Sequence, residues 1–329
     1  MGSNITTYRP GGHISSTSHP PAPTPKRGAT MHPLTPLLFA PLAAAACSRS
    51  ALTSARDAFF AAGSANSTAP LATNAKITLN NAVTPLASTP FTSLTNFTPF
   101  LAQAVDEEGC QIATMRVSPS QVLSTRLGLN VDGKIAEVEF LQAVQGDQFF
   151  RPSGFPSKQP EIYDAPQTPG PPPIIPPGWT PAKGTPKAEV NTATCKPGSG
   201  PARALTRTEL IYTANTYADG LGGAPWDSCL LGGSPCPRLE NGVQTTGECG
   251  VGAGSFGFGV FNRRFVADTL TGVVLGQFWF EYSGARVSMP TRLYLHEYFK
   301  VDAARLRYVL APMKGIPKAQ AAAEVWKSE

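Results

Sequence analysis

The chain has 329 residues, a formal net charge of +5 and 33 prolines that concentrate near the N-terminus and in the middle. This length accommodates two domains of ordinary size. Sequence-independent binding of nucleic acid needs several clustered phosphate contacts, and the scattered lysines and arginines of this chain argue against such a partner.

Two segments precede the predicted folded region. Residues 1–30 are polar, rich in Pro, Ser and Thr and without apolar periodicity, so we expect disorder there. Residues 31–46 form a short apolar run that ends in small residues and follows Lys26 and Arg27, which is typical of a signal peptide cleaved near Cys47. The alternative is an apolar leader without function. The run is too short to span a bilayer, so we predict no stable membrane span.

The remaining sequence contains one unit twice, at residues 47–150 and 203–314. Each unit begins with apolar residues at helical spacing and a Thr near the start that could cap the helix, at 52–62 and 205–215. The helix is followed in each unit by a segment that contains Asn, at 77–82 and 236–242.

Later in each unit, turns rich in Asp and Gly lead into strands at 105–117 and 266–278, and two further strands are joined at 131–133 and 301–303. An Asp-Gly pair between alternating apolar runs, as at Asp132, indicates a hairpin. We therefore predict an α+β fold in which each unit is a curved antiparallel sheet packed on an N-terminal helix.

Between the units, residues 151–202 are dense in proline, which favours polyproline II and removes sheet donors. We expect an extended spacer or strap; a docking motif for a proline-binding domain is the alternative. Residues 315–329 are rich in Ala and Lys and predict a frayed helical tail.

The cysteine and sequon pattern favours an oxidising, secretory route. Cys236 and Cys249 flank a short loop and should pair, and by elimination two further disulfides join Cys47 to Cys110 and Cys195 to Cys229. No C-x-x-C pair is present, which argues against a zinc ribbon. Glycosylation acceptors occur at Asn66 and Asn96.

The histidine inventory limits the chemistry. After removal of the leader only His296 remains, so a metal site of several histidines cannot form, and we predict no metal and no cofactor. The segment His296–Lys300 has Lys where a zinc protease needs its second His. The glycines of 252–257 match G-x-G-x-x-G, but no helix pattern follows, and a flexible loop is the better interpretation.

An acidic residue on an apolar strand face is the main anomaly. In the run 292–301, Glu297 shares its face with four apolar residues and needs a partner, for which Arg238, Arg263 and Arg264 are candidates. A structural Arg–Glu bridge and a catalytic carboxylate are equally open. As catalytic residues we predict Glu297, His296 and Arg238, and as substrate-binding residues Trp226, Arg263, Trp279 and Tyr294.

The second unit resembles a family of fungal secreted proteins, the DUF8021 domain. The resemblance rests on the segments 223–226, 236–242, 262–266 and 296–300, together with Cys249, Asp268 and 272–274. The first unit is similar through Asp106, Cys110 and 131–135. This resemblance implies two tandem cone-shaped units of the NTF2-like or SnoaL-like (cystatin-like) kind, whose open mouth holds a small apolar ligand.

The resemblance also implies a range of functions, because such cones include ketosteroid isomerase, polyketide cyclases, dehydratases and pure binding domains. We expect a secreted enzyme of secondary metabolism that cyclises or isomerises a polyketide or terpenoid, including by intermolecular hetero-Diels–Alder coupling. The alternative is a non-catalytic secreted protein that binds a small hydrophobic molecule. The two units should pack as an intramolecular pseudo-dimer in a monomeric chain.

Overall fold

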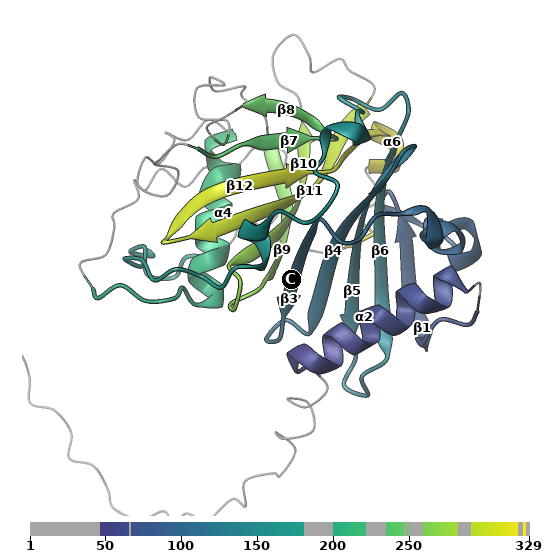
Figure 1. Ribbon diagram of the computed structural model, residues 1–329, viewed down its shortest axis with the longest axis horizontal. Coiled ribbons are helices and arrows are strands. Elements are labelled where there is room, and N and C mark those ends of the chain that lie inside the picture. Colours follow the sequence, from purple (N-terminus) through teal and green to yellow (C-terminus); the bar gives the residue numbers. More distant parts are fainter. Residues whose placement is uncertain are drawn as a thin grey trace, which may run out of the picture. The chain divides into compact units, whose positions relative to one another are not determined.

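Two curved β-sheets, one in each half of the chain, dominate the fold (Figure 1). The computed structural model describes residues 47–65, 67–180, 200–221, 235–246, 249, 259–281, 291–321 and 325–326. The leader, the signal peptide and the glycines of 252–257 lie outside the described residues. So do Asn66, Cys195, Trp226 and Cys229.

The first half begins with a helix and continues into a six-stranded sheet of order β2-β1-β6-β5-β4-β3. Its elements are α2 (Arg49–Ser64), β1 (Leu71–Leu79), β2 (Ala82–Val83), η1 (Leu86–Ser88), η2 (Pro90–Asn96), β3 (Ala102–Asp106), β4 (Gln111–Ser118), β5 (Gln121–Leu129) and β6 (Ile135–Val144).

The second half repeats this plan with a sheet of order β8-β7-β12-β11-β10-β9, to which β13 adds by pairing with β11. Two short elements precede it, η3 (Pro152–Gly154) and α3 (Glu161–Asp164). Its own elements are α4 (Arg207–Leu221), β7 (Arg238–Glu240), β8 (Val243–Thr246), β9 (Gly259–Ala267), β10 (Val273–Glu281), β11 (Thr291–Asp302), β12 (Arg305–Ala311), β13 (Met313–Pro317) and α6 (Lys318–Ala321).

The strand orders of the two sheets are identical once each strand number of the first half is raised by six, so the repeat read from the sequence is present in the topology. The α+β class is confirmed, but the purely antiparallel sheet is wrong. Strand β1 pairs with β6 in parallel, and β7 pairs with β12 in parallel. The last strand of each meander returns beside the first strand of its unit in the same direction, which makes both sheets mixed.

The helices start at the sequence positions that their caps select. In α4, Thr206 and Glu209 form a capping box, with the Thr206 N–H donating to Glu209 Oε2 at 2.8 Å and the Glu209 N–H donating to Thr206 Oγ1 at 3.4 Å. In α2 the cap is Ser48, not the expected threonine. Thr53 lies inside that helix and its hydroxyl donates to the carbonyl of Arg49 at 2.8 Å.

The predicted hairpins are confirmed, whereas the predicted tail is only partly helical. Gly133 has a φ of 71° in the turn between β5 and β6, and Ala303 and Ala304 have φ values of 48° and 59° between β11 and β12. The segment predicted as a helical tail begins as β13, and only Lys318–Ala321 is helical. Pairing along the edge of β11 satisfies the backbone of this segment in place of a helix.

The described part of the connector is a strap on the second half. Tyr163 is buried, and its hydroxyl donates to the carbonyl of Tyr298 at 2.8 Å. Gly170 forms a bridge with Arg203, and a Cβ at Gly170 would lie 2.4 Å from the backbone of Ala303. The chain therefore packs closely here, which only glycine permits.

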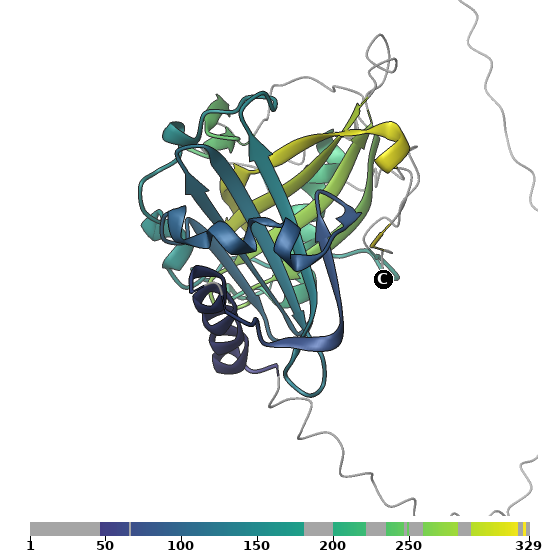
Figure 2. The same ribbon diagram turned by 90° about the vertical axis from the view of Figure 1, so that its right-hand side faces the viewer.

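Each half has its own apolar core between helix and sheet, and a third core joins the halves. In Figure 1, α2 lies across the first sheet and α4 across the second. The third core contains Met115 and Val122 of the first half and Val266 and Leu275 of the second. Figure 2 shows the strands of the two sheets as successive layers, in agreement with this shared core.

Reciprocal ion pairs cross between the halves. Arg49, the first residue of α2, binds Asp268 of the second half, and Arg207, the first residue of α4, binds Asp106 of the first half, at 3.1 and 2.9 Å. Each aspartate also accepts the backbone N–H of the residue that precedes the other aspartate, at 3.1 Å in both cases. Each half therefore supplies an arginine to the aspartate of the other half, and the equivalent residues of the two halves make equivalent contacts.

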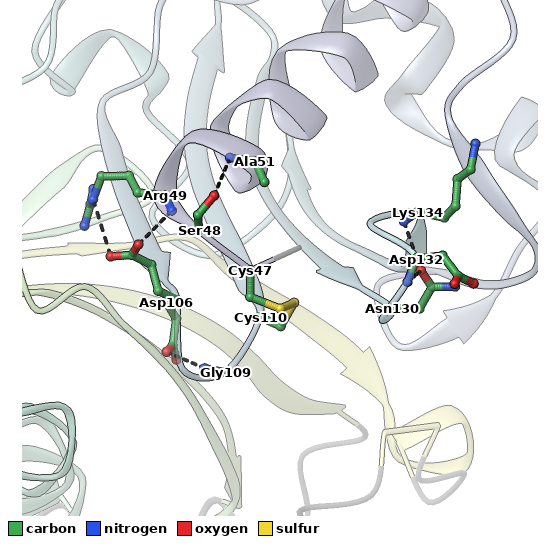
Figure 3. The surroundings of a disulfide bond; sticks show 11 residues. Cys47, Ser48, Arg49, Ala51, Asp106, Gly109, Cys110, Asn130, Asp132 and Lys134 are labelled. Carbon is green, nitrogen blue, oxygen red and sulfur yellow. Dashed lines mark hydrogen bonds and ion pairs between the residues drawn. A yellow bond between two sulfur atoms is a disulfide. The ribbon is translucent and has the colours of Figure 1, made fainter. Parts of the chain in front are cut away.

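Two predicted disulfides are confirmed. Cys47 pairs with Cys110 and Cys236 with Cys249, with Cα–Cα distances of 4.8 and 4.9 Å. Figure 3 shows the first of these joining the start of α2 to the turn between β3 and β4, beside the Ser48 cap. Asn96, at the end of η2, is exposed, so its glycosylation stays a prediction compatible with its position. In the described part of the chain, no helix has the length and apolarity to cross a membrane.

Candidate functional site

The interior of the second half, between α4 and the sheet, contains a buried polar cluster. Glu297 lies in the middle of β11, and its Oε1 accepts a hydrogen bond from Arg238 Nη2 at 2.7 Å. Arg238 comes from β7, and its Nη1 donates to the hydroxyl oxygen of Tyr217 in α4. We call Glu297, Arg238 and Tyr217 the Glu297 cluster. Of the three arginines that the sequence offered as partners for Glu297, Arg238 is the one that binds it.

Only one oxygen of the Glu297 carboxyl is used in this arrangement. Its Oε2 accepts no hydrogen bond from any described residue, although the side chain is fully buried. A buried polar atom without a partner is uncommon in proteins and calls for an explanation, and a catalytic role is one such explanation. Arg238 Nε lies 2.9 Å from Glu240 Oε1, in a contact without hydrogen-bond geometry.

The electrostatics of the cluster favour proton transfer at neutral pH. Burial raises the pKa of Glu297 to about 7, because the positive charge of Arg238 opposes the effect only in part and Glu240 adds to it. Burial opposes the charge on Arg238, but Tyr217, Glu297 and Glu240 outweigh it and raise the pKa, so the guanidinium stays charged. A carboxyl that is half ionised near pH 7 has the pKa that a general acid–base residue requires.

Aromatic side chains surround the cluster. The ring of Tyr217 lies 5.0 Å from the ring of Phe299, which also contacts Phe278. Gly276 stands opposite Glu297 in the β10–β11 register, and a Cβ there would lie 2.3 Å from the Phe278 ring. The glycine thus lets an aromatic ring cover the position beside the carboxyl, which keeps the surroundings of Glu297 apolar.

The predicted binding residue Arg263 lies in the same interior but in a separate ion pair. Its Nη1 donates to Asn215 Oδ1 at 2.9 Å and also to Asp219, and both partners come from α4. Burial raises the pKa of Asp219, and Arg263 opposes that shift. Arg263 therefore ties β9 to α4, and its contacts do not involve Glu297.

His296 lies on the opposite face of the sheet from Glu297, as alternation along a strand requires. Its Nδ1 is 2.8 Å from Ser124 Oγ, its Nε2 is 2.9 Å from the side-chain amide of Gln277, and the ring is fully buried. Burial lowers the pKa of His296. The predicted catalytic residues His296 and Glu297 therefore lie on opposite faces of the sheet, and His296 has no contact with the Glu297 cluster among its described hydrogen bonds.

Trp279 and Tyr294 are also on the His296 face. Their rings stack with centroids 4.6 Å apart and pack with Leu141, Phe261 and Ile316. The sequence placed these two residues in one pocket with Arg238 and Arg263. The structure separates them by the thickness of the sheet, because positions 294 and 297 differ by an odd number of residues.

Sequence reasoning missed another fully buried acid, Glu139 of β6. It accepts from Arg126 Nε at 3.0 Å, from Arg264 Nη2 at 2.8 Å and from the hydroxyl of Tyr294. Burial would raise the pKa of Glu139, but Arg264, His296 and Arg126 hold it well below the usual range. Because Arg264 lies in the other half, no local pattern could have paired it with Glu139.

The first half lacks an equivalent of the Glu297 cluster. Glu297 pairs with Gly276, eight residues after Asp268, and the corresponding pair in the first half is Thr125 with Thr114, eight residues after Asp106. Asn80 and Asn241 are equivalent residues of the two halves. Three residues before them, the first half has Ile77 and the second half has Arg238. The first half also has Phe59, ten residues after Arg49, where the second half has Tyr217, ten after Arg207. The polar cluster is therefore a property of the second half.

The described residues contain no group of three or more His, Cys, Asp or Glu side chains arranged to hold a metal ion. Residues 203–313 match the model of a family described as "Domain of unknown function (DUF8021)". The matched segment holds all three residues of the Glu297 cluster, and the resemblance to this family is confirmed for the second half. A comparison with curated proteins found no match.

Proposed function

We propose that the second half is a secreted acid–base enzyme that isomerises or cyclises a small hydrophobic polyketide or terpenoid, with Glu297 as the group that moves the proton. The single observation that carries the proposal is the buried Oε2 of Glu297, which has no described partner although the other oxygen binds Arg238. The disulfides are consistent with secretion. A helix packed on a curved sheet is consistent with the NTF2-like cone, which we propose for each half.

The residues suggest a simple sequence of steps. The Glu297 carboxylate removes a proton from a carbon next to a carbonyl, and the C–H electron pair forms an enolate. The Tyr217 hydroxyl and the Arg238 guanidinium are the groups nearest to Glu297 that can stabilise the enolate oxygen. Return of the proton from Glu297 to a different carbon isomerises the substrate, and attack of the enolate on an internal electrophile cyclises it.

The test uses a hydrophobic ketone with acidic α-protons, 2-tetralone, in D2O, with the protein as catalyst and NMR as the readout. We expect the protein to accelerate deuterium incorporation with a rate that rises through pH 7, because the base is the ionised form of Glu297. Glu297→Gln should lower this rate by roughly 10²-fold or more. Glu240→Gln is the matched control, because Glu240 also contacts Arg238, and it should keep the rate within a few-fold.

Two other outcomes have defined meanings. Hetero-Diels–Alder coupling needs a hydrogen-bond donor but no proton transfer. If the Glu297→Gln variant still coupled a polyketide to a terpene, the mechanism would be pericyclic and not acid–base catalysis. The full burial of the Glu297–Arg238 pair is the observation that favours a binding protein. Saturable binding of 2-tetralone without any deuterium incorporation would establish that function and overturn the enzyme proposal.

A further inference from the structure

Three cations from both halves surround one tryptophan of the last described segment. Around the ring centroid of Trp326, Lys76 Nζ lies at 4.0 Å, Arg126 Cζ at 4.7 Å and Arg264 Cζ at 5.6 Å. The indole N–H donates to Thr78 Oγ1 at 3.1 Å, and the side chain is 7% exposed. We call Lys76, Thr78, Arg126 and Arg264 the Trp326 seat.

The seat is made by the fold of the whole chain, not by the segment that occupies it. Lys76 and Thr78 come from β1, Arg126 from β5 and Arg264 from β9, so three strands of two sheets contribute. Glu139 binds both guanidinium groups and so holds them in place. A set of cations held in place before the ring arrives is preorganised for an electron-rich aromatic group.

Val325 and Trp326, the described part of the occupying segment, carry no side-chain charge that could balance the cations of the seat. Its three cations face two carboxylates among the described residues, Glu139 and Glu137, and the latter is 2.8 Å from Arg126. The charge left over is associated with Lys76, whose ammonium donates to the carbonyl oxygen of Val325. Burial lowers the pKa of Lys76. A neutral ring and a neutral carbonyl thus occupy a place where an anion would bind more strongly.

We propose that the Trp326 seat is a binding site for small aromatic carboxylates, which the protein's own Val325–Trp326 segment occupies in this structure. The ring of such a ligand takes the place of the indole against the three cations. Its carboxylate takes the place of the Val325 carbonyl on Lys76. The site is separate from the Glu297 cluster, because Arg264 points to the opposite face of the second sheet, toward Glu139.

Competition with the internal occupant sets the affinity that would be measured. A ligand binds only the fraction of molecules whose seat is empty, so the apparent dissociation constant is raised by the inverse of that fraction. Replacing Trp326 by Ala removes the competitor while the seat residues stay. We therefore expect the Trp326→Ala chain to bind a matching ligand about tenfold or more tightly than the wild-type chain.

The experiment uses indole-3-acetate as the probe, because it carries the ring of Trp326 and a carboxylate, with titration calorimetry on the full chain. Indole-3-acetamide and tryptamine serve as neutral and cationic analogues of the same shape. Trp326→Ala should bind indole-3-acetate more tightly than either analogue, and adding Lys76→Gln should abolish the preference for the carboxylate over the amide. Trp179→Ala is the control, since Trp179 packs against Tyr212 away from the seat and its removal should create no binding.

A second measurement covers the case in which Trp326→Ala does not fold. In the wild-type chain, 1 mM indole-3-acetate should speed amide hydrogen exchange at Val325 and Trp326, because a bound ligand displaces them, and the acetamide should do so less. Two outcomes would show that Trp326 is a structural contact and that no aromatic-carboxylate site exists. One is that indole-3-acetate neither binds Trp326→Ala more tightly nor speeds exchange in the wild-type chain. The other is that all three probes bind equally.

Discussion

The burial of Glu297 lowers the stability of the fold and at the same time gives the carboxyl a pKa suited to proton transfer. Its carboxyl is fully buried beside Arg238, and breaking such a pair normally leaves an uncompensated charge. Yet the pKa of Glu297 is raised to about 7, which means that burial disfavours the carboxylate more than Arg238 stabilises it. The fold therefore holds this acid at a cost, as is typical of groups retained for function.

The raised pKa gives a prediction for stability. Between the ordinary pKa of 4.5 and about 7, the folded chain keeps a proton on Glu297 that the unfolded chain releases, so the free energy of unfolding falls as the pH rises. The interval sets an upper limit of about 3 kcal/mol for this loss. Urea unfolding at pH 5 and pH 8 should show the fall in wild type and a smaller one in Glu297→Gln. Equal pH slopes in the two proteins would contradict the raised pKa.

At this scale the sequence offered Arg238 as one of three candidate partners of Glu297, and alternation along the strand places Tyr294 and His296 on the opposite face from Glu297. An acidic residue in register with apolar neighbours is a local anomaly, which alternation along one strand reveals. His296, Trp279 and Tyr294 were nevertheless assigned to the same pocket as Glu297, because their chemical types suit a binding site. Which face of the sheet looks into the α4 interior depends on the packing of the two sheets, and no single strand carries that information.

Among the elements, α4 offers a direct test of its start. Thr206→Ala removes the side chain that accepts the Glu209 N–H, and the free energy of unfolding should fall by about 1 kcal/mol. Thr208→Ala is the matched control, because Thr208 is exposed within the first turn of the same helix. Chemical denaturation of both variants measures the difference. Similar stability of the two variants would show that the capping box contributes little.

The two disulfides should contribute unequally. They span 63 residues for Cys47–Cys110 and 13 for Cys236–Cys249. Since loop-closure entropy grows with the logarithm of loop length, replacing the first pair by serine should destabilise the chain by about 1 kcal/mol more than replacing the second. Denaturation of the two double variants tests the order. The reverse order would show that local packing, not chain entropy, determines their contributions.

Strand pairing illustrates what sequence patterns leave open among elements. The helices and the hairpins were visible because each depends on residues close in sequence, and the repeat was visible because its two copies have similar segments in the same order. The parallel pairs β1–β6 and β7–β12 join strands that are distant along the chain, and apolar alternation is the same for a parallel and an antiparallel neighbour. The mixed sheets could therefore not be read from the pattern.

For the whole molecule, the reciprocal pairs formed by Arg49 with Asp268 and Arg207 with Asp106 indicate two equivalent halves with one distinctive interior. The first half fills the positions of the Glu297 cluster with Phe59, Ile77 and Thr125. These three positions hold no acid, whereas the sheet of the first half supplies Ser124, Arg126 and Glu139 to the contact between halves. We infer that the first half supports the fold of the second.

This interdependence can be tested at Glu139, the acid that joins the halves. Glu139→Gln removes the charge that Arg126 and Arg264 share in a fully buried position, so the free energy of unfolding should fall by about 3–5 kcal/mol. Glu137→Gln is the matched control on the same strand, because Glu137 also binds Arg126 but its side chain is 42% exposed, and it should cost at most about 1 kcal/mol.

The number of unfolding transitions tests the same interdependence of the two halves. If the halves depend on each other, far-UV circular dichroism and tryptophan fluorescence should follow one coincident transition in wild type, and in Glu139→Gln that whole transition should move to lower denaturant. Trp279 reports on the contact, since it packs against Leu141 of the first half. Two separate transitions, or equal losses in Glu139→Gln and Glu137→Gln, would mean that each half is stable alone and that the shared core contributes little to the native state.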